Sequence, residues 1–219
     1  MERAFIFDFN GVLWWDVRIQ EHVWDQVAVK LRGKPFSDEE KLHKLHGRPK
    51  EDILEYLTGR KMDKRELTVL ALEIENIYQK LCLEEGKDFK LSPGAVDLLE
   101  RLKRSSTPMT IATSSDKGDV DFFANHLHLE NWFDISKIVY NDGSFPGKPA
   151  PDTYLKSCKV LGVDPKDAVA IEDSESGIRA AQAAGIGKII ALGPKERHDK
   201  LLQLDGVTQV VENLGQIGV

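Results

Sequence analysis

The chain has 219 residues, of which 41% are hydrophobic, and its 30 Lys and Arg against 36 Asp and Glu give a net charge of -6. The length suits one large domain or one domain with an insertion, and the negative charge argues against nucleic acid as the main partner. No apolar run approaches the ~20 residues of a membrane span, and the N-terminal sequence lacks a signal-peptide pattern. Two cysteines without paired spacing favour reduced thiols. We therefore expect a cytoplasmic protein with no membrane association, and no feature demands a partner protein.

Short apolar runs alternate with helical patterns along most of the chain. The predicted strands cover residues 4–8, 109–113, 137–140, 168–171, 188–192 and, more weakly, 209–211. The helical patterns between them cover residues 93–103, 117–128, 152–161, 176–184 and 196–204. Alternation of strand and helix predicts an α/β fold with a doubly wound, Rossmann-like parallel sheet covered on both faces.

One long stretch interrupts this alternation. Between residues 16 and 90 there is no convincing strand, and four helical patterns cover residues 19–31, 37–45, 50–57 and 64–84. Ser37 and Glu40 have the spacing of a capping box at the start of the second helix. We expect residues 16–90 to form an all-helical domain, inserted into a catalytic core made of residues 1–15 and 91–219.

Polar clusters follow four of the predicted strands. In chain order they are Asp8 with Asn10, Thr113-Ser114-Ser115, Lys148, and Glu172-Asp173. Ligands of doubly wound sheets bind at the carboxyl ends of the strands, where these clusters would meet. A carboxylate nucleophile, hydroxyl donors, a cation and acidic metal ligands suit phosphoryl transfer. Taken alone, each cluster has an ordinary structural explanation as a helix cap, a turn or a solvated lysine; the four together indicate one site.

The order of these clusters, with GKPAPDTYL around Lys148 and IEDSESGIRAAQAAGI around Asp173, resembles the haloacid dehalogenase superfamily. The similar branch contains phosphatases and β-phosphoglucomutases with a helical cap inserted after the first strand. The resemblance implies that Asp8 is a nucleophile that forms an aspartyl-phosphate. It also implies that Thr113 and Ser114 bind the transferring phosphoryl group, and that Lys148 pairs with both the nucleophile and the phosphoryl oxygens.

The resemblance implies Mg²⁺ as the cofactor. Asp8 and Asp173 would be ligands, with Glu172 as a direct ligand or a supporting partner. The remaining protein ligand would be the main-chain carbonyl of Asn10, which an Asp-to-Asn difference leaves intact. Carboxylate and carbonyl oxygens are the donors that this hard cation prefers.

Asn10 stands where the phosphatase branch normally has an aspartate that protonates the leaving oxygen and then activates water. Loss of a general acid/base typically lowers the rate ~10²–10⁴-fold. Four explanations are open. The substrate could carry a leaving group that needs little protonation, or another group could take the place of the missing acid/base. Asn10 could be an introduced mutation, or the protein could bind phosphorylated ligands without useful turnover.

The segment His46-Gly47-Arg48-Pro49-Lys50 resembles the cap-loop signature of the same family. Arg48 or Lys50 could hold a distal part of the substrate, or could simply flank the start of a helix. We expect a Mg²⁺-dependent phosphohydrolase of a small phosphorylated metabolite. The alternative is a phospho-ligand-binding pseudoenzyme; a mutase or a phosphonoacetaldehyde hydrolase-like enzyme fits less well.

Overall fold

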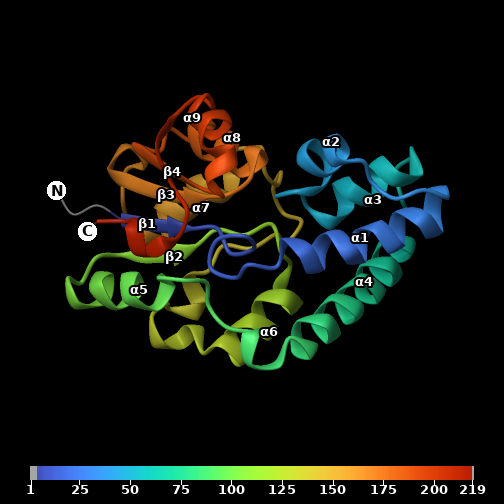
Figure 1. The fold of residues 1–219 in the computed structure, drawn as a ribbon, viewed down its shortest axis with the longest axis horizontal. Helices are drawn as coiled ribbons and strands as arrows, with labels where there is room; N and C mark the ends of the chain where they lie inside the picture. Colours follow the sequence, from blue (N-terminus) through green and yellow to red (C-terminus); the bar gives the residue numbers. More distant parts are fainter. Residues whose placement is uncertain (1–3, 219) are drawn as a thin grey trace.

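The computed structural model describes residues 4–218, and its centre is a five-stranded parallel sheet (Figure 1). The strands are β1 (Ala4–Phe7), β2 (Met109–Ile111), β3 (Ala168–Glu172), β4 (Lys188–Leu192) and β5 (Val207–Val211), in the spatial order β2-β1-β3-β4-β5. Strand β1 therefore lies between the two strands that precede the predicted hydroxyl and acidic clusters. The carboxyl ends of β1, β2 and β3 meet at one edge of the sheet.

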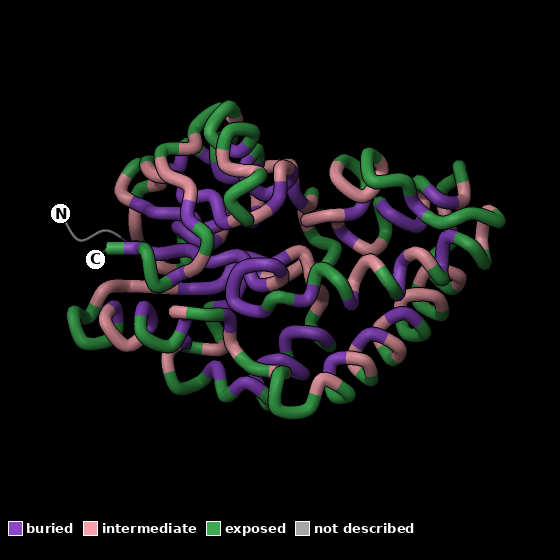
Figure 2. The backbone as a smooth tube through the Cα atoms, in the orientation of Figure 1, coloured by how far each residue is buried: buried purple, intermediate pink, exposed green. Residues whose placement is uncertain are grey.

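Helices cover both faces of the sheet, because alternate residues of each buried strand point to opposite sides. On one face, Phe5 and Phe7 of β1 join an apolar core with α5 (Ala95–Arg104) and α6 (Lys117–Leu127). On the other face, Ile6 packs with residues of three helices. These helices are α7 (Asp152–Leu161), α8 (Glu175–Ala183) and α9 (His198–Leu202). In Figure 2 the strands form the buried centre between these helical layers.

The segment between β1 and α5 is helical and lies beside the sheet rather than over it (Figure 1). Its elements are α1 (Val17–Arg32), α2 (Asp38–Glu40), a π-helical turn (Lys41–Leu45), α3 (Lys50–Thr58) and α4 (Lys64–Glu84). Helix α1 packs against both α3 and α4. Short 3₁₀ turns occupy Gly86–Asp88, Leu129–Asn131, Ile135–Lys137, Pro165–Asp167, Lys195–Arg197 and Leu214–Gln216. We call residues 16–90 the cap and propose that they form a domain separate from the core.

The α/β class, the parallel sheet and the capping box are confirmed. The strand predicted at 137–140 is wrong. Its first residue ends a 3₁₀ turn, and Val139 makes only an isolated bridge with Ala112 beside β2. The apolar stretch is too short to continue the ladder before the turn at Gly143. Among residues 4–218, no helix is long and apolar enough to cross a membrane.

Candidate active site

The turn after β1 positions the predicted nucleophile. Asp8 follows the last residue of the strand, and its main-chain N–H donates to the Ile171 carbonyl of β3, 3.0 Å away. Gly11 has a φ of 82°, a left-handed conformation that glycine adopts without steric cost. A Cβ atom on Gly11 would overlap the carboxylate of Asp173. The glycine therefore lets the β1 turn and the end of β3 approach closely.

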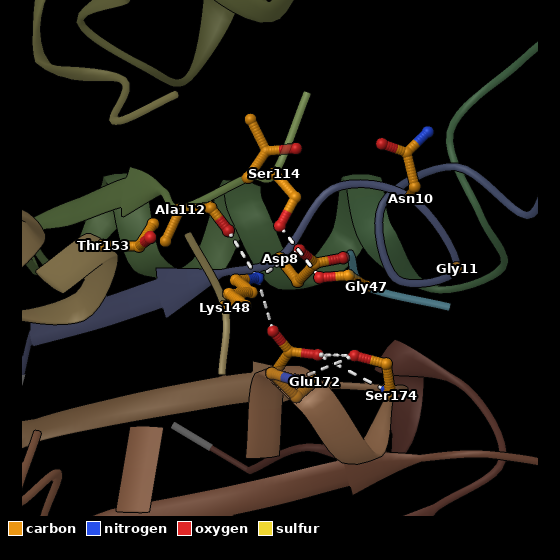
Figure 3. Close-up of polar contacts among 12 residues, drawn as sticks. Asp8, Asn10, Gly11, Gly47, Ala112, Ser114, Lys148, Thr153, Glu172 and Ser174 are labelled. Carbon is orange, nitrogen blue, oxygen red and sulfur yellow. Dashed lines mark hydrogen bonds and ion pairs between the residues drawn. The ribbon is translucent and has the colours of Figure 1, made fainter. Parts of the chain in front are cut away.

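Lys148 is the centre of a buried polar network (Figure 3). Its ammonium donates to Asp8 Oδ1 at 2.5 Å, to Glu172 Oε1 at 2.5 Å and to the Ala112 carbonyl at 2.9 Å. The lysine side chain is fully buried, so these acceptors replace its hydration. The three contacts fix the ammonium between β1, β2 and β3. Lys148 is thus a structural and electrostatic partner of Asp8, rather than a solvated loop lysine.

Glu172 accepts hydrogen bonds on both carboxylate oxygens. Oε1 accepts from Lys148 and, at 2.8 Å, from the Tyr154 hydroxyl. Oε2 accepts from the Ser174 hydroxyl at 3.1 Å and from the Asp173 main-chain N–H at 3.2 Å. Ser174 in turn caps α8 by accepting from Gly177 N. Glu172 therefore ties the end of β3 to α7, α8 and the lysine.

Burial dominates the electrostatics of the carboxylates. It raises the pKa of Asp8 to about 7, against the opposing effect of the Lys148 ammonium. It also raises the pKa of Asp173 well above its usual range, and the nearby charges of Asp8 and Glu172 add to that rise. Burial alone would lower the pKa of Lys148, but Asp8 and Glu172 hold it above its ordinary value. The site thus carries more negative charge than one lysine offsets.

These carboxylates fit a divalent metal ion. Oxygen atoms of Asp8, Glu172 and Asp173 lie within 4.8 Å of one another. The raised pKa of Asp173 shows that its negative charge is under-compensated, which a bound dication would correct. An all-oxygen set of this kind suits a hard cation such as Mg²⁺ rather than a thiophilic metal.

The amide of Asn10 is held by three side chains. Its Nδ2 donates to Asp16 Oδ2 at 2.7 Å and to the Tyr78 hydroxyl at 3.1 Å, and its Oδ1 accepts from Ser115 Oγ at 2.9 Å. The Tyr78 hydroxyl also donates to Asp16, which is fully buried. Burial raises the pKa of the Asp16 carboxyl, although the hydrogen bonds from Tyr78, Gln20 and Asn10 oppose that rise. Both amide hydrogens of Asn10 are thus used by the protein.

The hydroxyl cluster after β2 lines the same cleft. Thr113 and Ser114 line it together with Asp8 and Asp173. Thr113 is buried, and its Oγ1 accepts from Ser115 N at 3.1 Å. Ser114 Oγ donates to the Gly47 carbonyl at 3.0 Å, a contact between the sheet edge and the cap (Figure 3).

The two predicted cap cations also line this cleft, and they differ in their surroundings. The ammonium of Lys50 lies 2.7 Å from Asp116 Oδ2 and 2.8 Å from Asp119 Oδ2, both on the core side. Arg48 has one ion pair, with Asp52 at 3.9 Å, and a marginal hydrogen bond to the His43 carbonyl at 3.5 Å. Lys50 is bound by carboxylates, whereas Arg48 is held loosely.

The structure brings all the predicted site residues to one cleft or to the network beneath it. Sequence reasoning missed Tyr154, Asp16, Tyr78 and Asp119. Tyr154 lies within the GKPAPDTYL motif, so that motif contained a signal for it. Asp16 and Tyr78 are separated by 62 positions and meet only through the packing of the cap, for which no local pattern exists.

Comparison with known proteins agrees with this geometry. A family model described as haloacid dehalogenase-like hydrolase matches residues 2–185. A phosphorylated carbohydrates phosphatase of Thermotoga maritima is 30% identical over 95% of this chain and 94% of its own. Hexitol phosphatase A of Escherichia coli is 26% identical over 99% and 94%. The crystal structure of a haloacid dehalogenase family IA hydrolase from Entamoeba histolytica superposes with a TM-score of 0.87 and 38% identity, covering 99% and 96% of the two chains.

The chain therefore belongs to the haloacid dehalogenase-like hydrolase family. Its relatives in that family include phosphatases, and the chain is a hydrolase of this phosphatase type.

Proposed function

We propose that this protein is a Mg²⁺-dependent phosphohydrolase that acts on a small phosphorylated metabolite through an aspartyl-phosphate on Asp8. The observation that carries the proposal is the buried contact of Asp8 with Lys148 at 2.5 Å, at the strand edge that also presents Thr113 and Asp173. The names of its curated relatives, which refer to phosphorylated carbohydrates and a hexitol phosphate, support a small phosphorylated substrate.

In the first step a carboxylate oxygen of Asp8 attacks phosphorus, and the bond from phosphorus to the leaving oxygen breaks. The Thr113 hydroxyl, main-chain groups of Ser114 and the Lys148 ammonium would stabilise the charge on the phosphoryl oxygens. In the second step water attacks the phosphorus of the aspartyl-phosphate, which releases inorganic phosphate and restores the Asp8 carboxylate. Lys148 stays in place throughout, because two other acceptors hold it.

The metal would be held by Asp8, Asp173 and the main-chain carbonyl of Asn10, and it would neutralise charge on the phosphoryl group. Glu172 is also within reach of this set, but both of its oxygens already accept hydrogen bonds. We therefore assign Glu172 to orienting Lys148 and the end of β3 rather than to direct coordination.

Asn10 offers the leaving oxygen no proton, since both of its amide hydrogens are bound to Asp16 and Tyr78. These hydrogen bonds favour substrates whose leaving group departs without protonation, such as acyl or aryl phosphates. The same observation favours the second candidate, a phospho-ligand-binding protein with slow turnover.

Steady-state hydrolysis of acetyl phosphate, para-nitrophenyl phosphate and an alkyl phosphate with Mg²⁺ distinguishes these two functions. We expect measurable turnover of the first two substrates, much slower turnover of the alkyl ester, and loss of all activity in Asp8→Asn. Asp121→Asn, which removes an exposed carboxylate on α6, is the matched control. Uniformly slow turnover together with tight binding of vanadate would favour the binding protein instead.

A further inference from the structure

The cap lines the part of the cleft that lies away from Asp8. The charged side chains there disfavour binding of a second anionic group. Lys50 is the cation placed deepest there, with a side chain that is 19% exposed. Asp119, 5% exposed, and Asp116 both contact its ammonium. Glu75 of α4 lies within 4.8 Å of both carboxylates. The positive charge of Lys50 is thus satisfied by the protein, with additional negative charge around it.

Other cations of the cleft do not supply the missing positive charge. His46 pairs with Glu21 Oε1 at 3.0 Å, and burial lowers the pKa of its imidazole, which favours the neutral ring. Arg48 is loosely held on the cap side of the cleft, and its ion pair is with Asp52; Arg197 lies on the core side, 3.5 Å from the Asp173 carbonyl. Lys50 therefore has three carboxylates around it (Glu75, Asp116 and Asp119), and Arg48 is paired with a fourth, Asp52.

Much of the remaining cap wall is apolar, although Gln20 and the Tyr78 hydroxyl also line it. Val23 and Trp24 of α1, Ile53 of α3 and Ile74 of α4 line the cleft and are buried. Covering apolar atoms of a ligand with such a surface favours binding, whereas removing a charged group from water to place it there disfavours binding. A single guanidinium beside it can bind hydroxyl or carbonyl oxygens of an uncharged molecule.

We propose that this cleft selects compounds with one phosphate and an uncharged body that presents an apolar face, and that the Lys50–Asp116–Asp119 cluster excludes a second phosphate. The selectivity is a matter of charge: a distal dianion would meet Asp119 and a lysine that is already neutralised, and like charges brought together disfavour binding. This inference names the substrate class of the proposed phosphatase site, and so rests on that function.

Two non-hydrolysable ligands test the inference without requiring turnover: phenylphosphonate and 1,4-phenylenebisphosphonate, measured by calorimetry with Mg²⁺. We expect the monophosphonate to bind at least about tenfold more tightly, a difference of about 1.4 kcal/mol. In Asp116→Asn/Asp119→Asn, which frees Lys50 and removes two negative charges, the preference should shrink about tenfold or reverse. Asp121→Asn on the same helix should leave it unchanged.

The kinetic counterpart compares kcat/KM for 4-methoxyphenyl phosphate and hydroquinone bisphosphate, which share an aryl leaving group. The same preference and the same response to the double variant are expected. Equal or tighter binding of the bisphosphonate by the unmodified protein would overturn the inference, as would a preference that the double variant leaves intact. If acetyl phosphate is not hydrolysed while the phosphonate preference holds, the proposed function fails and the selectivity of the cleft stands.

Discussion

Asn10 and Asp16 form a matched pair of side chains. The amide Nδ2 donates to a carboxylate that lies 2.7 Å away and is fully buried. A carboxylate at position 10 would face a like charge, so the two carboxyl groups would have to share a proton, which is then held between them. The amide is therefore the side chain that this environment accepts, and a single substitution does not simply restore an acid/base.

Exchanging the side chains at positions 10 and 16 should restore more phosphatase activity than changing Asn10 alone. Asn10→Asp/Asp16→Asn keeps the amide–carboxylate hydrogen bond with donor and acceptor reversed, whereas Asn10→Asp alone replaces it with a proton shared between two buried carboxyl groups. We expect the double variant to hydrolyse an alkyl phosphate ~10²-fold faster or more, in line with the value of a general acid. The single variant should gain less and be destabilised by ~1–3 kcal/mol. Equal rates in the two variants, measured beside urea unfolding curves, would contradict this account.

At the scale of elements, the alternation of buried strands and helices was predictable because each strand is short, rich in apolar residues and followed by polar or glycine-containing sequence. Strand 137–140 failed because only Val139 of that run pairs beside β2, and an edge strand depends on partners that the sequence does not identify. The four clusters could be assigned to one edge, since parallel strands place their carboxyl ends together. The contacts of Asn10 could not, because Asp16 and Tyr78 meet through the docking of α4.

The β1 turn depends on Gly11 for two separable reasons, a left-handed φ of 82° and the close approach of Asp173. Gly11→Ala should strain the turn and displace the Asp173 carboxylate, lowering activity by ~10²-fold and weakening Mg²⁺ binding. Gly33→Ala is the matched control: its φ is 78°, but a Cβ there meets nothing within 4 Å. Both variants should lose stability through the left-handed φ, Gly11→Ala should lose more because of the overlap with Asp173, and only Gly11→Ala should lose activity. Equal activity in the two would show that the close approach is unimportant.

For the whole molecule, metal binding and stability should be linked through Asp173. When folding raises the pKa of a carboxyl, the protein loses stability as pH increases from the unfolded pKa through the folded pKa, so burying Asp173 destabilises the metal-free protein near neutral pH. Asp173→Asn should therefore raise the melting temperature without metal.

In the unmodified protein, Mg²⁺ at 100 times its Kd should add ~2.7 kcal/mol to the free energy of unfolding, or roughly 5–10 °C to the melting temperature, and the variant should lose this shift. Calorimetric scans with and without Mg²⁺ measure both effects, and a variant that melts lower without metal but still responds to Mg²⁺ would contradict the assignment.

The central claim is that Asp8 becomes phosphorylated during turnover. Because Asn10 supplies no base to activate water, the second step should be slow and the phosphoenzyme should accumulate. The most direct measurement is intact-protein mass spectrometry after acid quenching of a reaction with acetyl phosphate and Mg²⁺, followed by mapping of the modified peptide. We expect one added phosphoryl group on the peptide that contains Asp8, absent in Asp8→Asn and retained in Asp121→Asn. Rapid phosphate release without any phosphoenzyme, or phosphorylation that persists in Asp8→Asn, would contradict it.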